Sequence, residues 1–234
     1  MGKEVKRFWK DVALSQEEEG WSIALDGRPL KTPARATLMV DARSLAEAIA
    51  EEWRGCGEDI DPRQMPLTGL ANAAIDHVAP APVVFRNELA QYAEGDLLCY
   101  RAEHPPKLIA AQAAAWDPLL DWARQRFGVE FAVTAGIVHV PQPPATIAGL
   151  AAALTPASPF ELAALSPIVT IGGSLVTALA LFEGAIDCDT AWSAVSVDDR
   201  WQIDQWGYDD EAVAALANRR QDFTAAARFL DLLG

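Results

Sequence analysis

A long, nearly uncharged stretch is the feature that most limits how this chain can fold. Between Phe131 and Phe182, Glu161 is the only residue with a formal charge. Surface segments usually carry charged side chains, so most of this stretch must lie in a core or form an apolar surface that contacts another protein. A chain of 234 residues is long enough to bury such a core, as one large domain or two small ones.

The residues between Glu161 and Glu183 must also be compared with a membrane span, because they carry no charge over a length that could cross a bilayer. Ser166-Pro167 interrupts this segment, and acidic residues flank it without a positive cluster. We therefore expect helix buried in protein. Ser158 and Glu161 match a capping box at the start of one helix, and Ser166-Pro167 predicts the start of the next.

The sequence "TIGGSLV" inside this segment has two readings. It looks superficially like a nucleophile elbow, but Val176 stands where the second glycine of G-x-S-x-G belongs, and no strand precedes it. Gly172 and Gly173 lack side chains, so a neighbouring helix could approach closely. Each glycine costs about 1 kcal/mol of helix propensity, which close packing would offset. We interpret Gly172, Gly173 and Ser174 as packing residues.

The periodicity of apolar residues changes from strand to helix along the chain. Trp21, Ile23 and Leu25 alternate with small residues, and Asp26-Gly27 after them predicts a tight hairpin. From about residue 41 the spacing is helical, and Pro118 predicts a kink or break in one long helix. We predict an α+β fold with a small β-rich N-terminal domain, residues 1–65, and a larger multi-helical domain, residues 66–234. The boundary between them falls within residues 40–80.

Charge and cysteine content limit the partners and the compartment. A net charge of −14 disfavours binding to nucleic acid and to anionic membrane surfaces. The C-terminal part, from Glu183 onward, is acidic and contains no lysine, so a basic protein surface would suit it. Its cysteines are odd in number and widely spaced, which is typical of reduced thiols. The N-terminal segment resembles neither a signal peptide nor a transit peptide, so we expect a cytoplasmic protein.

Motifs for metal, nucleotide or triad chemistry are missing. The histidines lie in unrelated segments, and Leu30 occupies the position where a phosphate loop needs glycine before its lysine. We therefore expect no metal, no cofactor and no enzyme activity. A remote alternative is a hydrolase that uses scattered carboxylates such as Asp96, Asp117 and Asp199.

A polar and aromatic segment, "SVDDRWQIDQWGYDDEA", is predicted to lie in a helix from about Thr190 to Trp206. At helical spacing one face carries apolar and polar residues together, namely Trp192, Val195, Asp199, Gln202 and Trp206. Asp198 and Asp199 point about 100° apart, so they cannot flank one scissile bond. Asp199 and Gln202 either satisfy an internal polar network or form a polar contact beside exposed tryptophan, and these readings remain equally open.

Several short motifs occur in order along nearly the whole chain, and together they carry a resemblance. They are "RFWKDV", "LDGRPLKTP", "LAEAIAEEW", "MPLTGLANAAID", "DLLCYRAEHP", "WDPLLDWARQRFGV", "ELAALSPIVTIGGSLVTALAL" and "DDRWQIDQWGYDDEA". The chain resembles the assembly chaperones that bind the free α subunit of the catalytic head of ATP synthase, in mitochondria and in α-proteobacteria.

The resemblance implies a function without enzyme activity or cofactor. Such a chaperone shields a surface of the α subunit, its client, until that surface meets β, and so prevents aggregation. The implied protein is a monomer in the bacterial cytoplasm, or in the mitochondrial matrix for eukaryotic members. The alternative that remains is an interaction module of the same scaffold with another client.

The resemblance also assigns roles to residues. It implies that Asp199 contacts the client, with Asp198 second and Gln202, Trp201 and Asp204 beside them. Packing within or between domains is implied for Trp53, Trp192, Trp206, Gly207, Gly172, Gly173 and Ser174. Two positions depart from the family pattern: Cys56 replaces a usual glutamine, and the acid at Asp199 is more often glutamate.

Overall fold

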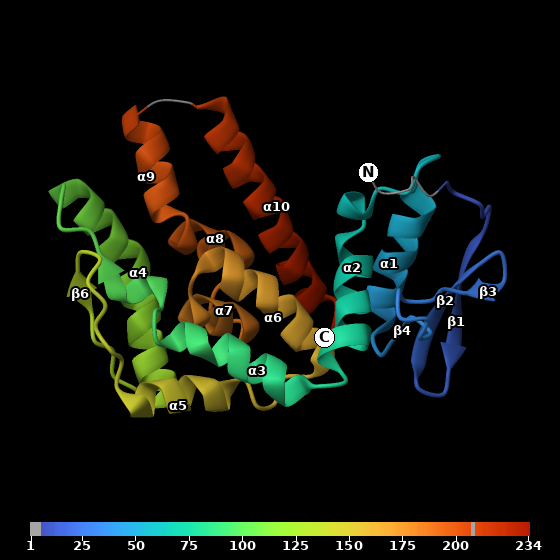
Figure 1. Ribbon diagram of the computed structural model, residues 1–234, viewed down its shortest axis with the longest axis horizontal. Coiled ribbons are helices and arrows are strands. Elements are labelled where there is room, and N and C mark those ends of the chain that lie inside the picture. Colours follow the sequence, from blue (N-terminus) through green and yellow to red (C-terminus); the bar gives the residue numbers. More distant parts are fainter. Residues whose placement is uncertain (1–5, 207–208) are drawn as a thin grey trace. The chain divides into compact units, whose positions relative to one another are not determined.

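The fold is α+β, as predicted, in a computed structural model that describes residues 6–206 and 209–234, with only the backbone of Trp206 (Figure 1). Contacts divide the chain into two compact units. The first contains the chain up to Pro82 together with Ser158–Ala164 and Arg228–Gly234, and the second contains Val83–Ala157 and Leu165–Ala227.

The first unit is built on a small antiparallel sheet. Strand β2 (Gly20–Leu25) pairs with β1 (Val12–Glu17), β3 (Arg28–Pro29) and β4 (Met39–Val40). Asp26 and Gly27 both have positive φ, 48° and 77°, which confirms the predicted hairpin turn. Ile23 and Leu25 point into a core shared with the next helices, α1 (Arg43–Gly55) and α2 (Pro66–Ala73).

A partly buried carboxylate fixes the start of α2. Glu52 on α1 accepts hydrogen bonds from the backbone N–H groups of Leu67 and Thr68, both at 2.8 Å, and from the Thr68 hydroxyl at 2.7 Å. Burial raises the pKa of Glu52, and these donors oppose that rise. The side chain therefore supplies acceptors that the first turn of α2 needs.

Helices and a short parallel strand pair make up the second unit. Its elements are α3 (Pro82–Ala90), β5 (Tyr100–Arg101), α4 (Pro106–Phe127), β6 (Thr134–Ala135), α5 (Pro144–Ala153), α7 (Leu175–Phe182), α8 (Cys188–Val195), α9 (Val197–Trp206) and most of α6 (Pro159–Gly172) and α10 (Asp210–Asp231). The long helix α4 packs against α7, α8 and α9. Short 3-10 or π turns occur at Pro62–Gln64, Ala74–Val78, Gln91–Ala93 and Leu97–Cys99.

Prolines lie inside two of the helices. The prediction that Ser166-Pro167 starts a new helix was wrong, because both residues lie within α6. Helix α4 continues through Pro118, so the break, one of the two outcomes predicted there, does not occur. Helix α6 ends at Gly172 and is followed by Gly173, whose φ of 65° is left-handed, and Ser174 caps α7 by accepting from the N–H of Thr177 at 3.0 Å.

The start of α6 agrees with its prediction. The backbone N–H of Ser158 donates to the Glu161 carboxylate at 2.6 Å, and the N–H of Glu161 donates to the Ser158 hydroxyl at 3.2 Å. These reciprocal bonds are the predicted capping box. Within the described residues, no helix combines the length and the apolar character that crossing a membrane requires.

The uncharged stretch divides into the two environments that its sequence allowed. Its C-terminal part, α6 and α7, is largely buried, including Leu165, Val169 and Leu179. Its N-terminal part contains side chains that are strongly exposed, with Ile137 fully exposed and Val138 73% exposed. Such apolar exposure outside a core is typical of a surface that contacts another molecule.

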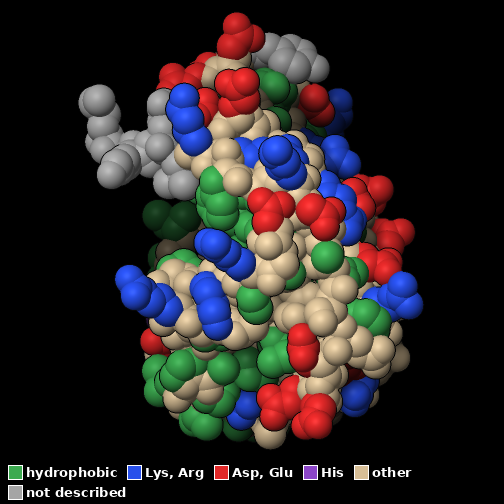
Figure 2. Space-filling view, turned by 90° about the vertical axis from the view of Figure 1, so that its right-hand side faces the viewer, with side chains coloured by type: hydrophobic (Ala, Val, Ile, Leu, Met, Phe, Trp, Pro, Cys, Tyr) green, Lys and Arg blue, Asp and Glu red, His purple; other side chains and the backbone are tan. Residues whose placement is uncertain are grey.

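Charges of both signs cover the face of the first unit that Figure 2 presents. Acidic side chains and lysine or arginine side chains are interspersed there. This face therefore does not carry the acidic excess of the sequence as a single-sign surface.

Candidate functional site

The predicted helix from Thr190 to Trp206 is two helices, so the continuous stripe expected along it does not exist. Helix α8 ends at Val195 and α9 begins at Val197, with Ser196 between them at φ −106° and ψ 15°. The Ser196 hydroxyl donates to the carbonyl of Trp192 at 2.6 Å. A side-chain bond of this kind competes with the helix ladder and is consistent with the end of α8 at Val195, which periodicity did not indicate.

Arg200 stabilises this junction. Its guanidinium donates to the carbonyl of Ser193 at 2.5 Å and to that of Ser196 at 3.4 Å. Carbonyl groups at a helix C-terminus lack intrahelical donors and attract positive charge. The guanidinium of Arg200 is therefore held at the end of α8, although the side chain remains exposed to solvent.

Asp198 connects α9 to α4. Its carboxylate accepts a hydrogen bond from the Gln112 side-chain amide at 2.7 Å, and the Gln112 amide oxygen accepts from the N–H of Ala102 at 2.8 Å. Gln112 is only 2% exposed, so its polar atoms need these partners. Asp198 thus belongs to an internal polar network, the arrangement that the sequence analysis considered for Asp199 and Gln202.

Asp199 points to a different neighbour. Its carboxylate lies 3.1 Å from the Arg219 guanidinium of α10, and Arg219 also donates to the carbonyl of Ile171 at 3.1 Å. The Asp199 and Arg219 side chains remain 39% and 42% exposed. This ion pair therefore links α9 to α10 while leaving the Asp199 carboxylate accessible to a partner.

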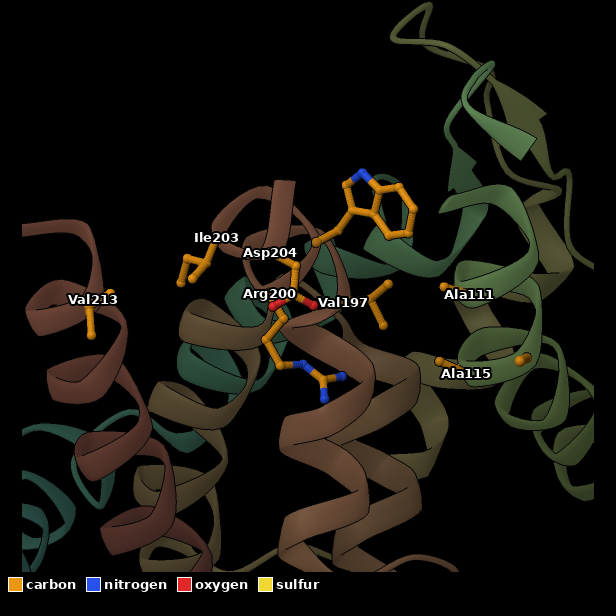
Figure 3. A pocket seen from close by; sticks show the side chains of 9 residues that line it. Ala111, Ala115, Val197, Arg200, Ile203, Asp204 and Val213 are labelled. Atoms are coloured by element: carbon orange, nitrogen blue, oxygen red, sulfur yellow. The ribbon is translucent and has the colours of Figure 1, made fainter. Parts of the chain in front are cut away.

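Trp201 lies between two grooves of the second unit and lines both. The first, which we call the alanine groove, has a volume of about 640 Å³. It is lined by Ala111, Ala114 and Ala115 of α4, Val197, Arg200, Trp201, Ile203 and Asp204 of α9, and Val213 of α10. Figure 3 shows its α9 residues between Ala111 and Ala115 on one side and Val213 on the other.

The second, which we call the loop groove, has a volume of about 450 Å³. Tyr100, Glu103, Ile137, Asp198, Trp201 and Gln202 are among its lining residues. The loop that follows β6 reaches it through the exposed Ile137, and the Tyr100 hydroxyl meets the His139 ring at 3.1 Å. An exposed aliphatic side chain therefore borders the same space as Trp201 and Gln202.

The structure thus groups the predicted contact residues around α9 without placing them on one face. Asp198 and Gln202 border the loop groove, Asp204 borders the alanine groove, and Trp201 borders both. Asp199 lies instead on the side of α9 that meets α10.

Gly172, Gly173 and Ser174 occupy a close helix junction. A Cβ atom at Gly172 would lie 3.1 Å from Cγ1 of Val195 and 3.7 Å from the Phe223 ring. The carbonyl of Gly173 accepts a hydrogen bond from the N–H of Leu97 at 2.9 Å. These contacts agree with packing rather than ligand binding at the Gly-Gly-Ser sequence.

The predicted packing tryptophans lie in separate cores. Trp53 packs edge-to-face on Trp9 in the first unit, with ring centroids 5.0 Å apart. Trp192 is 6% exposed in the second unit and contacts Phe223. The Trp206 side chain and Gly207 lie outside the described residues.

Asp96 is a structural residue that sequence reasoning did not identify as such. It is fully buried, and its carboxylate accepts from the N–H groups of Leu98 and Val176, each at 3.0 Å. Burial raises the pKa of Asp96 to about 6, against the lowering effect of these donors and of Ser174. Its position at the start of α7 satisfies the orphan donors of that helix.

The hydrolase alternative gains no support from these carboxylates. Asp96 binds the start of α7, Asp117 pairs with Arg101 at 2.7 Å, and Asp199 pairs with Arg219. Among the residues that the structure describes, histidine, cysteine and acidic side chains form no group of three or more that could hold a metal ion. The carboxylates therefore have separate structural partners instead of a shared cleft.

Comparison with known proteins identifies close relatives. The profile of the family described as "ATP12 chaperone protein" matches residues 6–124. The crystal structure of Atp12 from Paracoccus denitrificans is 42% identical, with a TM-score of 0.92 and 98% of each chain covered. The crystal structure of the Atu1473 protein from Agrobacterium tumefaciens is 39% identical, with a TM-score of 0.93, over 98% of this chain and 86% of that one. Mitochondrial protein atp12 of Schizosaccharomyces pombe is 26% identical over 219 residues, which are 88% of this chain and 75% of that protein.

Proposed function

Because this chain belongs to the ATP12 family of ATP synthase assembly chaperones, we propose that it binds the unassembled α subunit of the catalytic head and prevents its aggregation until β arrives. Membership in the family accounts for a role as a chaperone in ATP synthase assembly. Our proposal adds that the client is the α subunit, that a defined surface of this chain contacts it, and that β causes its release.

The observation that carries the proposal is the surface around α9. Trp201 separates two grooves with apolar linings, and Ile137 is fully exposed at one of them. A chaperone that holds an unassembled subunit must offer apolar surface to the region that the missing subunit will later cover. Acidic side chains at the edges of such a surface would guide a basic client and disfavour wrong partners.

We rank the α9 residues as client contacts by the exposure of their side chains and by whether another residue already binds them. Asp204 and Gln202 are exposed, and Asp199 is accessible beside Arg219. Asp198 is held by Gln112, so it would act mainly by fixing α9. Binding carried by surface and charge needs neither a catalytic group nor a cofactor, and we propose a monomer in the bacterial cytoplasm that uses none.

A direct test is the aggregation of purified α subunit during dilution from denaturant, followed by light scattering. An equimolar amount of this chain is expected to suppress most of the scattering, because binding competes with self-association. An acidic protein of similar size is the control and is expected to have little effect. Scattering that stays unchanged when this chain is present in excess would refute the proposal.

A further inference from the structure

We propose that the alanine groove binds an amphipathic helix of the α subunit whose apolar face is accompanied by lysine or arginine side chains. The inference rests on the proposed function and goes beyond it, because it names one groove and the chemistry of its occupant.

The shape of the groove suits a helix. Ala111, Ala114 and Ala115 have the i, i+3, i+4 spacing of one helix face, and their side chains end at Cβ. A second helix can therefore set larger side chains between α4 and α9, which is the helix-in-groove mode of recognition.

The lining of the groove supplies apolar contacts. Trp201, Ile203 and Val213 are half-buried around it, and Figure 3 shows Ile203 and Val213 on neighbouring helices. A tryptophan beside a desolvated groove is the residue type that most often dominates the binding energy of a protein interface. A volume of about 640 Å³ leaves room for several side chains of an incoming helix.

The charges at the groove determine which helix fits. Arg200 is directed at the carbonyls of Ser193 and Ser196. The carboxylate of Asp204 is exposed, and no described side chain forms a hydrogen bond or ion pair with it. In the lining itself the single charges of Arg200 and Asp204 offset one another. Asp209, Asp210 and Glu211 lie within about one helical turn of Val213 and add negative charge beside the groove, which complements lysine or arginine in the occupant.

The test fills the groove without disturbing the core. Ala114 is exposed, so Ala114→Trp is expected to fold normally and to occupy the space that the client helix needs. The matched control is Ala148→Trp, an exposed alanine on α5 that does not line the groove. Circular dichroism and the urea midpoint of each variant verify its folding.

Binding is measured with two probes, the free α subunit and a synthetic amphipathic helix of leucine and lysine. Ala114→Trp is expected to weaken both by at least about tenfold, equivalent to about 1.4 kcal/mol, and Ala148→Trp is expected to bind as the wild type does. Asp204→Lys is expected to weaken the binding of the leucine–lysine peptide. A peptide of leucine and glutamate is expected not to bind the wild-type protein.

The outcomes separate this inference from the proposed function. Equal capture of the α subunit by Ala114→Trp and wild type would overturn the groove assignment while leaving the chaperone function standing. Equal binding of the two peptides would overturn the charge assignment. Failure of the wild type itself to bind the α subunit would refute both the proposed function and the occupant named here.

Discussion

Asp96→Ala is expected to lower the free energy of unfolding by at least about 2 kcal/mol near neutral pH, because buried donors lose their acceptor. The N–H groups of Leu98 and Val176 and the hydroxyl of Ser174 all direct a hydrogen at this carboxylate. The negative charge also interacts favourably with the start of α7. Urea unfolding followed by tryptophan fluorescence measures the loss.

The same variant should change the pH dependence of stability. Burial raises the pKa of Asp96 in the folded protein to about 6, so between its unfolded and folded pKa values the folded state binds the extra proton. The stability contributed by this protonation is present at low pH and is lost as pH rises through about 6. The difference in the free energy of unfolding between wild type and Asp96→Ala should therefore increase by about 1 kcal/mol when the pH is lowered from 7.5 to 5.

Asp121→Ala is the matched control, since Asp121 is 61% exposed and pairs with its helix neighbour Arg124. Asp121→Ala should lower the free energy of unfolding by less than about 1 kcal/mol. Two results would contradict the role assigned to Asp96. One is that Asp96→Ala loses no more free energy of unfolding than Asp121→Ala does. The other is that the stability difference between wild type and Asp96→Ala stays constant with pH.

Asp199→Lys is expected to reduce capture of the α subunit by at least about tenfold, which corresponds to about 1.4 kcal/mol of binding free energy. The substitution reverses the charge on the accessible part of α9. It also sets a second cation beside Arg219, whose guanidinium lies 3.1 Å from the present carboxylate. Pull-down of α subunit at matched protein concentrations measures the effect.

A neighbouring ion pair provides the control for Asp199. Asp189 lies 3.1 Å from Arg220, and its side chain is 85% exposed. Asp189→Lys therefore makes the same charge change at a similar pair outside the proposed contact surface, and capture is expected to stay within about twofold of wild type.

Arg219→Ala separates direct contact from positioning. If Asp199 touches the client, this variant keeps the carboxylate and should retain capture. Loss of capture in Arg219→Ala to the same extent as in Asp199→Lys would show that the ion pair between α9 and α10 matters instead of the charge on Asp199.

Local sequence chemistry predicted the elements whose signals are complete within a few residues. Asp26-Gly27 gave the hairpin because both positions tolerate positive φ, and Ser158 with Glu161 gave the helix start because both partners lie in one turn. The break at Gly173 was missed because its carbonyl is bonded to Leu97, which is distant in the sequence. The break at Ser196 was missed although its hydroxyl bonds to Trp192 within one turn, because a serine in a helix does not always form such a bond. Helix α4 runs through Pro118, so one proline alone did not determine a helix end.

The contact residues were predicted by type, but their surroundings were not. Asp198 and Asp199 are adjacent in sequence, yet their partners are Gln112 and Arg219 on different helices. No periodicity within one segment indicates such pairs. The spacing of Ala111, Ala114 and Ala115 was a usable signal for a smooth helix face, although only the fold shows that α9 and α10 border it.

The most direct measurement is affinity purification of this chain after co-expression with the α subunit alone and, separately, with β alone. Size-exclusion chromatography with light scattering gives the stoichiometry of what is captured. The account predicts a soluble one-to-one complex with α, no complex with β, and release of α when β is added. Aggregation of α beside an unliganded chain, or equal capture of α and β, would contradict it.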